Sequence, residues 1–399
     1  MKLYFFHSTQ NNSSIYSKIK NQIYTFDYYK EKGLLESFFA ITDTCLSNEC
    51  AIFETGAGSI KYRMSSKNTK LDVIYNWRFA RLLMFKKALR YININKYTHI
   101  YFRRAILDDL TISFFKKLKK IGVQIIYEIP TFPYDQELEY VRPLIKKLDF
   151  KYRSELKKYV DIVVTPSPLK AGEKIFGIDV LYIPNGIAVE LIKETRATLQ
   201  NCNTISAIGV AGLASWHAYE RFIEGLREYY ENHGDRNIVF HIVGGNENNE
   251  YYRLYKELVD KYSLSGHVIL HGTKYGQELD EIFDNCNVGI EALGNSRKGI
   301  QVSSSLKTRE YTARGLPVVA SGKIDVYSDQ YQYVMYVPED ESSVDICKFI
   351  EFYDKIYPNA ESYKEVHDYI RSFAKESCDM RQLMLPIINY ISLLDDKNK

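Results

Sequence analysis

Short apolar runs alternate with longer helical stretches along the chain, and this alternation limits the folds open to it. In the first half the runs are Lys2–Phe6, His99–Phe102, Gln124–Tyr127, Ile162–Thr165 and Val180–Ile183. In the second half they are Ile205–Val210, Ile238–Val243, Val268–His271, Val288–Glu291 and Pro317–Ser321. Strands separated by helices are joined by right-handed crossovers, which place the strands parallel in sheets with helices on both faces. The sequence therefore predicts an α/β protein with one doubly wound, Rossmann-like parallel sheet in each half.

The length of 399 residues also exceeds what one hydrophobic core usually supports. A Pro184-Asn185-Gly186 turn and the polar stretch Glu194–Thr204 mark the boundary that the sequence favours. We expect an N-terminal domain at 1–190 and a C-terminal domain at 191–377, with a last helix at about 378–395 packing back on the first domain.

Charge is divided between the halves. Residues 1–200 contain 32 Lys or Arg and 20 Asp or Glu, a balance of +12, whereas residues 201–399 contain 21 and 30, a balance of −9. Basic residues interleave with apolar ones in Trp77–Ile92 and Phe114–Ile121, a mixture that fits an anionic phospholipid surface. The alternative is two amphipathic helices whose basic face is simply solvated. No recognition motif supports a nucleic-acid partner.

Cysteine usage and hydropathy indicate the cellular setting. The six cysteines form no C-x-x-C pair and no Cys/His cluster at zinc spacing, so we expect neither a disulfide framework nor a bound metal. The N-terminus lacks a signal-peptide pattern, and no apolar run is long enough to span a bilayer, which favours a cytoplasmic protein.

Ligands of open parallel sheets bind beyond the carboxyl ends of the strands. Polar or glycine-rich residues follow three predicted strands of the second half, and the candidates there are Gly212, His217, Gly244, Gly272 and Thr273. Glycine lets a ligand approach the backbone, but it also makes tight turns between strand and helix, so each position alone has a structural alternative.

The segment from Leu293 to Ser321 is the most informative. Leu306–Arg314 is predicted to be a helix that Gly315 ends, and its N-cap candidates are Ser303, Ser304 and Ser305. The free N–H groups of Leu306 and Lys307 at its start, beside Arg297 and Lys298, would form a phosphate site. This arrangement predicts that the segment binds a pyrophosphate group.

Glu310 lies within the same predicted helix. Leu306, Glu310 and Ala313 fall at i, i+4 and i+7, so Glu310 should face inward. An inward carboxylate needs a donor, and the hydroxyls of a ribose are one such partner. A salt bridge to Arg309, Arg314 or a more distant cation is the alternative.

At this point the chain resembles the retaining glycosyltransferases of family 4, two-domain enzymes of the GT-B fold that use sugar nucleotides. The segments that carry the resemblance, in order, are Asp161–Ser167, Ile183–Ile187, Ile242–Gly245, Val268–Gly272 and Leu306–Val319. They cover about half the chain and leave the first 150 residues uncovered. Trp216-His217 and Leu293–Gly299 are similar to runs in a subgroup from bacterial capsule and exopolysaccharide loci.

The resemblance implies a donor held by the C-terminal domain and an acceptor held by the N-terminal domain. Glu310 matches the glutamate that binds the donor ribose, and Thr273–Glu278 would frame the base. The diphosphate would be held by Arg297, Lys298 and the Ser303–Ser305 helix start, which explains why such enzymes need no divalent metal. The sugar would pass to an acceptor hydroxyl with its anomeric configuration retained.

Two departures from the family concern the donor site. The second glutamate of the family pattern, eight positions before Glu310, is replaced by Val302. The cation that usually follows the first strand of the C-terminal domain is absent, since Ala214 and His217 occupy that region.

Three residues at N-terminal strand ends are further candidates. Glu128 follows a predicted strand, near where relatives place a histidine that touches the sugar, and it has either a direct catalytic role or a structural hydrogen-bonding one. Arg103 and Arg104 would meet an acceptor pyrophosphate or form a surface pair. We name Glu128, Arg297 and Lys298 as the catalytic candidates.

The sequence therefore predicts a retaining, metal-independent glycosyltransferase of bacterial surface polysaccharide synthesis, peripheral on the inner face of the cytoplasmic membrane. Its donor would be a nucleotide diphosphate sugar, with UDP favoured, and its acceptor a glycan on a polyprenyl diphosphate. A non-catalytic GT-B partner of an active glycosyltransferase and a sugar-nucleotide epimerase are the alternatives, and a homo-oligomer is left open.

Overall fold

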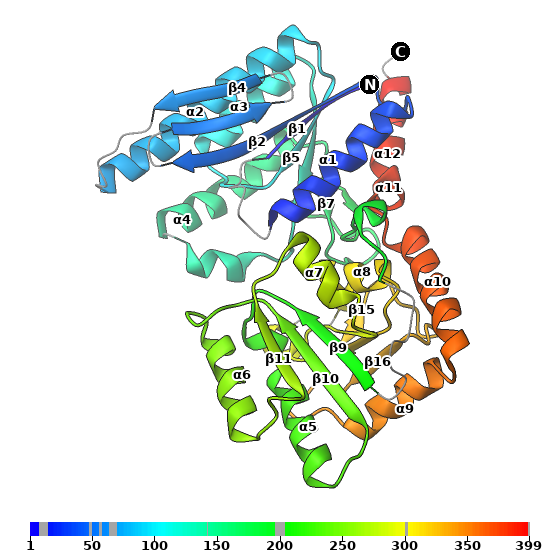
Figure 1. The fold of residues 1–399 in the computed structure, drawn as a ribbon. Helices are drawn as coiled ribbons and strands as arrows, with labels where there is room; N and C mark the ends of the chain where they lie inside the picture. Colours follow the sequence, from blue (N-terminus) through cyan, green and yellow to red (C-terminus); the bar gives the residue numbers. More distant parts are fainter. Residues whose placement is uncertain are drawn as a thin grey trace. The chain divides into compact units, whose positions relative to one another are not determined.

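The structure of the protein is a computed structural model that describes residues 1–7, 15–47, 50–55, 58–63, 70–141, 143–195, 204–299 and 302–397. Contacts along the backbone divide the chain into two compact units (Figure 1). The N-terminal unit comprises Met1–Pro184 and Met380–Lys399, and the C-terminal unit comprises Asn185–Asp379.

The N-terminal unit is built on an eight-stranded sheet with the order β4-β3-β2-β1-β5-β6-β7-β8. Its strands are β1 (Lys2–Phe6), β2 (Ser37–Ser47), β3 (Cys50–Thr55), β4 (Gly58–Arg63), β5 (His99–Arg103), β6 (Gln124–Glu128), β7 (Ile162–Thr165) and β8 (Val180–Tyr182). The five strands predicted from apolar runs are present and parallel. The sequence did not predict β2–β4, and β3 and β4 pair antiparallel. The apolar runs Phe38–Ile41 of β2 and Cys50–Phe53 of β3 were not recognised as strands, and β4 has no continuous apolar run.

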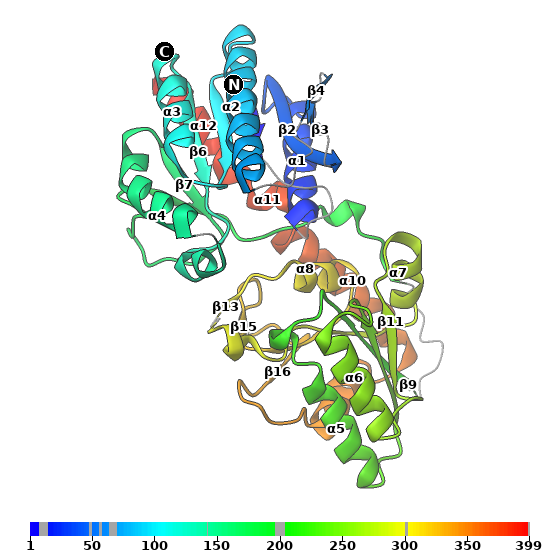
Figure 2. The same cartoon turned by 90° about the vertical axis from the view of Figure 1, so that its left-hand side faces the viewer.

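Helices cover both faces of this sheet (Figures 1 and 2). Phe6 of β1 packs on one face against Phe85 and Phe114, which belong to α2 (Lys70–Ile94) and α3 (Asp109–Lys120). The next residue back, Phe5, points to the other face and packs against Phe26 of α1 (Ile15–Glu31). Successive strand residues thus feed two separate cores, as a doubly wound sheet requires. The remaining helical segments are η1 (Asp135–Tyr140), α4 (Pro143–Tyr152), η2 (Arg153–Lys158), α11 (Met380–Leu383) and α12 (Leu385–Lys397).

The C-terminal unit has a six-stranded parallel sheet with the order β11-β10-β9-β12-β14-β16. The strands are β9 (Thr204–Val210), β10 (Asn237–Val243), β11 (Val268–Gly272), β12 (Val288–Ile290), β14 (Val318–Ser321) and β16 (Val334–Val337). From β9 the next two strands, β10 and β11, are added on one side, and the following strands, β12, β14 and β16, are added on the other side of β9. The strand order therefore reverses between β9 and β12, which is where such sheets bind ligands.

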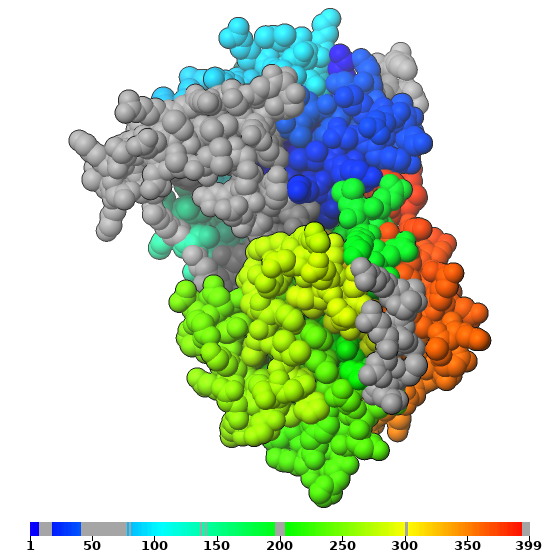
Figure 3. All heavy atoms as spheres, in the orientation of Figure 1, coloured from blue at the N-terminus to red at the C-terminus, as the bar shows by residue number. Residues whose placement is uncertain are grey.

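The helices of this unit are α5 (Glu220–Glu231), α6 (Glu250–Lys261), α7 (Gly276–Phe283), α8 (Leu306–Ala313), α9 (Ile346–Ile356) and α10 (Ala360–Ser377). Its short elements are η3 (Val189–Leu191), η4 (Ser215–His217), η5 (Asn295–Lys298) and the strand pair β13 (Val302–Ser303) and β15 (Lys323–Ile324). On the face drawn in Figure 3, the yellow-green surface of this unit belongs to the stretch that contains α6 and α7.

The predicted helix after the three serines is confirmed, and it ends one residue earlier than expected. Ser305 is its N-cap residue and Arg314 its C-cap residue. Gly315 stops the helix with φ of +84°, and a Cβ atom there would lie 2.3 Å from the ring of His367. Only glycine fits this turn without strain.

None of the helices among the described residues is long and apolar enough to cross a bilayer.

Candidate functional site

The loops that follow β9 and β12 meet at the point where the strand order of the C-terminal unit reverses. The N–H of Leu293 donates to the carbonyl of His217 over 3.0 Å, and the N–H of Gly294 donates to the carbonyl of Trp216 over 3.1 Å. These bonds join η4 to the start of the predicted phosphate segment. The structure thereby brings together His217 and Lys298, which the sequence indicated as separate candidates.

His217 is a buried, neutral imidazole in this cluster. Its Nδ1 accepts the N–H of Ala214 at 3.0 Å, so the proton of the neutral ring lies on Nε2. Burial first, and then the charges of Lys307 and Lys298, lower the pKa of His217 to about 2. At neutral pH the side chain is therefore a hydrogen-bond donor without charge.

Lys307, in the first turn of α8, brings a cation to the same place. Its ammonium is buried and has no hydrogen-bond acceptor among the described residues, and the nearest acid is Glu291, with Nζ and Oε1 3.8 Å apart. Burial lowers the pKa of Lys307, Glu291 opposes this effect and the charge of Lys298 adds to it. An anion bound beside Lys307 would supply the missing acceptor and charge.

The start of α8 also offers backbone donors. No side chain of the described ranges caps it, and its first turn contains no acidic residue. Of the three predicted serines, Ser303 is buried in β13, while Ser304 Oγ accepts from the N–H of Asn185 and from Arg309, each over 3.2 Å. Ser305 precedes the first free N–H groups. The amides of Leu306 and Lys307 thus lack a side-chain cap, as the predicted phosphate site requires.

Arg297 has an environment that was not predicted from the sequence. Its Nη1 donates to Glu220 over 2.7 Å and to the carbonyl of Ser215, and its Nε and Nη2 donate to the two oxygens of Glu341. These carboxylates raise the pKa of Arg297 further above its usual range. A diphosphate would have to displace one of them to reach this guanidinium.

Lys298 lies next to Arg297 but has different surroundings. Its Nζ is 3.4 Å from the centroid of the Trp216 ring. The aromatic face holds the ammonium near His217, whose pKa responds to it.

Glu310, one turn into α8, pairs with Arg314. Arg314 Nε and Nη2 lie 3.2 Å and 3.1 Å from the same oxygen, Oε1. No described residue donates to Oε2, and 27% of the side chain is exposed. The salt bridge that the sequence left as the alternative is therefore present, and it leaves one carboxylate oxygen for another donor.

The predicted glycines differ in what their surroundings require. Gly244 has φ of +128°, and a Cβ atom there would lie 1.8 Å from the carbonyl oxygen of Ala211, so packing alone explains this glycine. Gly272 has φ of +66°, and the Thr273 hydroxyl donates to the carbonyl of Gly245 over 3.1 Å. A Cβ atom added at Gly212 would meet no described atom within 4 Å, so packing does not require glycine there.

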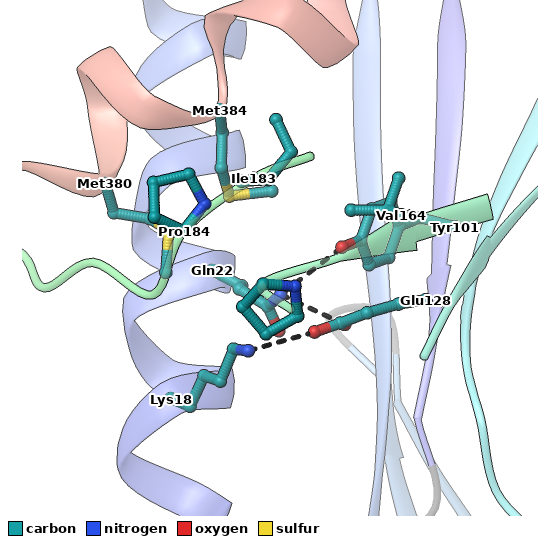
Figure 4. A pocket seen from close by; sticks show the side chains of 10 residues that line it. Lys18, Gln22, Tyr101, Glu128, Val164, Ile183, Pro184, Met380 and Met384 are labelled. Atoms are coloured by element: carbon teal, nitrogen blue, oxygen red, sulfur yellow. Dashed lines mark hydrogen bonds and ion pairs between the residues drawn. The ribbon is translucent and has the colours of Figure 1, made fainter. Parts of the chain in front are cut away.

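In the N-terminal unit, Glu128 and Arg103 form a buried ion pair at the carboxyl ends of β6 and β5. The carboxylate also accepts from Lys18 at 3.2 Å and from Gln22 at 3.1 Å, both on α1 (Figure 4). Burial raises the pKa of Glu128, but Arg103, Lys18 and Gln22 together outweigh it, and the pKa is lowered to about 2. The carboxylate is thus ionised and fixed, which matches the structural role named as one alternative.

A small cavity lies beside this ion pair. Its volume of about 10 Å³ leaves room for about one water molecule, and it is lined by Lys18, Gln22, Tyr101 and Glu128 together with Pro184, Met380 and Met384 (Figure 4). A sugar does not fit a space of this size.

Arg104 lies apart from that pair. Its guanidinium stacks on the ring of Tyr134, 3.5 Å from the centroid, rather than joining Arg103. The structure therefore does not bring the two arginines together as one phosphate-binding pair.

Several residues of these clusters were not predicted from the sequence, among them Glu291, Asp280 and Lys18. Glu291 is buried and directly follows strand β12. The rule that pointed to the glycine-rich strand ends, namely that ligands bind beyond the carboxyl ends of strands, could also have indicated Glu291. Asp280 pairs with Arg314 over 2.7 Å, and Lys18 on α1 reaches Glu128 at the end of β6. No local spacing in the sequence signals these two long-range pairs.

The basic stretches proposed for a membrane are helices packed on the sheet. In α3 the buried residues are Thr111, Ile112, Phe114, Phe115 and Leu118, and the lysines between them lie on the outer face. In the other stretch the side chain of Trp77 lies outside the described residues. Helix α3 therefore packs on the sheet with its lysines exposed to solvent, which was the alternative to a membrane surface. The same exposed lysines would also be available to an anionic membrane.

Comparison with solved structures identifies proteins with a similar fold. The chain is similar to a glycosyltransferase from Rickettsia africae, with 12% identity, 98% of each chain covered and a TM-score of 0.64. It is similar to Anabaena HepE in complex with UDP, with 12% identity, 98% of this chain and 100% of that chain covered and a TM-score of 0.61. Sucrose-phosphate synthase from Thermosynechococcus elongatus gives 13% identity, 99% of both chains covered and a TM-score of 0.60.

These neighbours are GT-B glycosyltransferases, and the chain has the GT-B fold, with a doubly wound sheet in each unit. The predicted fold class is confirmed. No protein-family model and no curated protein sequence matches the chain.

Proposed function

We propose that this protein is a glycosyltransferase that uses a nucleotide diphosphate sugar, with UDP as the favoured nucleotide. The observation that carries the proposal is the buried ammonium of Lys307, which has no hydrogen-bond acceptor in the described part of the chain and lies at the uncapped start of α8. Lys298 and the Nε2–H donor of His217 belong to the same cluster. A diphosphate would accept from Lys307 and the α8 amides and would lie beside Lys298 and His217.

The rest of the donor would extend from this anion site. Glu310 Oε2, one helical turn further along α8, would accept from the ribose hydroxyls. The loop from Thr273 to Glu278 would frame the base, and Gly212 leaves space at the end of β9. HepE, one of the similar structures, was solved in complex with UDP-glucose, which agrees with a donor of this class.

Transfer would follow from how the departing nucleotide is stabilised. As the bond between the sugar and the diphosphate breaks, negative charge grows on the β-phosphate. Lys307, Lys298 and the α8 amides would stabilise that charge without a divalent metal. The acceptor hydroxyl would attack on the face from which the nucleotide departs and would give its proton to the departing β-phosphate, so the reaction would retain the anomeric configuration.

The proposal also covers the acceptor substrate and the location of the protein in the cell. We propose a polyprenyl diphosphate-linked glycan as acceptor, in bacterial capsule or exopolysaccharide synthesis on the inner face of the cytoplasmic membrane. The exposed face of α4 supports this, because Leu144 and Phe150 are exposed there together with Lys147 and Lys151. Apolar and basic residues on one exposed face suit an anionic lipid surface.

The test is to incubate the purified protein with UDP-sugars, with and without EDTA, and to measure nucleotide release and the sugar product. We expect UDP release that EDTA leaves unchanged and that an acceptor accelerates. Absence of UDP-sugar binding at millimolar donor would contradict the proposal. Conversion of the donor sugar without acceptor would identify an epimerase, and binding with activity only in a partner enzyme would identify a scaffold.

A further inference from the structure

Arg314 is a buried cation that joins two helices of the C-terminal unit. Its Nη2 lies 2.7 Å from Oδ1 of Asp280, on α7, and 3.1 Å from Oε1 of Glu310, on α8. Its Nη1 donates to the carbonyl of Lys193 over 3.3 Å, and its guanidinium lies 4.0 Å from the centre of the Phe283 ring. Only 4% of the residue is exposed. The guanidinium is therefore held by contacts to two acids, a carbonyl and an aromatic ring.

The contacts to Glu310 have a specific geometry. Nε and Nη2 both end on Oε1, so the planar guanidinium holds one carboxylate oxygen with two donors. Glu310 is partly exposed, with 27% of its side chain accessible, whereas only 5% of the Arg314 side chain is accessible. The carboxylate is thus fixed from its buried side, and Oε2 is the oxygen that remains for a ligand.

We propose that Arg314 is a positioning residue for the nucleoside: it fixes Glu310 so that Oε2 meets the ribose hydroxyls. This inference rests on the proposed function, because it assigns a role to Arg314 in the same donor site. Arg314 also links α8 to α7 through Asp280, and α7 begins directly after the loop Thr273–Tyr275 that would frame the base. Arg314 thus contacts both Glu310, which would bind the ribose, and the helix that follows the loop proposed to frame the base.

A merely structural role for Arg314 makes a different prediction. A cation between two acids would stabilise the packing of α7 on α8, and its loss would lower the free energy of unfolding without selecting between ligands. Positioning of Glu310 instead affects the ligand hydroxyls that Oε2 contacts. The discriminating quantity is therefore the ratio of the affinity for UDP to the affinity for 2′,3′-dideoxyuridine diphosphate, which lacks both hydroxyls.

Asp280→Asn is the matched control. It removes the other acid of Arg314 and weakens the same helix packing, but it leaves Nε and Nη2 beside Glu310. Arg314→Lys serves as the second variant, because it keeps the charge and packing while losing the two-donor contact to Oε1. It remains informative if Arg314→Met does not fold.

The experiment is calorimetric titration of the full chain with UDP and with 2′,3′-dideoxyuridine diphosphate. We expect the wild type and D280N to prefer UDP about tenfold, since a hydrogen bond to a charged group contributes about 1.5 kcal/mol. R314M and E310Q should lose that preference, R314K should retain part of it, and R314M should add nothing in the E310Q background.

Each contrary result has its own meaning. A tenfold preference that survives in R314M or is unchanged in R314K would overturn the inference while leaving the proposed function in place. Equal loss of preference in D280N would also overturn it, in favour of helix packing. A wild type that binds neither nucleotide would overturn the proposed function and this inference with it.

Discussion

The Nζ atom of Lys307 lies 3.8 Å from Oε1 of Glu291, so a buried ammonium faces a buried carboxylate at a distance too long for a hydrogen bond. Glu291 instead accepts the N–H of Ala292. The pair balances charge while leaving the donors of the ammonium unused by any described residue. This is the arrangement expected of a cation kept ready for an anionic ligand.

Replacing Lys307 with Met should affect both binding and stability. We expect the affinity for UDP to fall at least tenfold, because a charge-assisted contact to the diphosphate is lost. The free energy of unfolding should fall by about 3 kcal/mol, because Glu291 is left buried without its cation. Urea unfolding and calorimetry measure the two effects. In K307M/E291Q, stability should partly return and UDP affinity should not; return of affinity would contradict the role of Lys307.

The pH dependence of donor binding should identify the same lysine. His217, with a pKa lowered to about 2, stays neutral at ordinary pH, so the affinity for UDP-glucose should not change around pH 6.5. The pKa of Lys307 lies below its usual 10.5, and its charged form favours the anion. Affinity should therefore fall as the pH rises through the lowered pKa of Lys307, and K307M should lack this alkaline decline. An inflection near pH 6.5 that disappears in H217Q would contradict the assignment of a neutral imidazole.

Glu128 should contribute to stability rather than to catalysis. Its pKa falls from 4.5 to about 2 on folding, so its ionised form stabilises the fold by about 3 kcal/mol above pH 4.5, and this contribution is lost as the pH falls toward 2. Denaturant titrations of E128Q and wild type should differ by this amount at pH 7 and converge at low pH. The turnover number per folded molecule should stay within a few-fold of wild type. A stable E128Q protein without turnover would restore the catalytic alternative.

The α4 surface should bind anionic lipid. Lys147 and Lys151 lie beside the exposed Leu144 and Phe150, and each lysine near such a surface contributes about 1 kcal/mol. K147Q/K151Q should therefore lower the affinity for phosphatidylglycerol vesicles about thirtyfold in a sedimentation assay. K348Q/K355Q, which changes two exposed lysines of α9, is the matched control and should bind as wild type. Equal binding by both double variants would contradict a docking role for α4.

The sequence predicted most of the fold because buried parallel strands leave a strong local signal. Each run such as Ile238–Val243 is apolar on both faces, and each has become a strand. The helix from Leu306 was predicted for a similar local reason, since a serine precedes it and Gly315 follows it. Strands β2 and β3 contain short apolar runs, Phe38–Ile41 and Cys50–Phe53, that were not recognised, and β4 lacks such a run, so the pairing of these strands with the sheet was not predicted.

The candidate site was predicted less completely because its chemistry depends on pairs distant in the chain. The sequence indicated Arg297 as a cation of the phosphate site and Lys307 only through its backbone N–H. The guanidinium of Arg297 is hydrogen-bonded to Glu220 and Glu341. Among the described residues, the only acidic partner of Lys307 is Glu291, at 3.8 Å. No local spacing distinguishes an occupied cation from an available one. The Glu128 pair with Lys18 and Arg103 is likewise a product of tertiary packing.

The most direct measurement is calorimetric titration of UDP into wild type and E310Q, with E257Q, an exposed glutamate variant on α6, as control. We predict that wild type and E257Q bind UDP with the same affinity and that E310Q binds it about tenfold more weakly while unfolding at the same temperature. Equal affinity of E310Q and wild type for UDP, or no binding of UDP by the wild type, would contradict a nucleotide site at the start of α8.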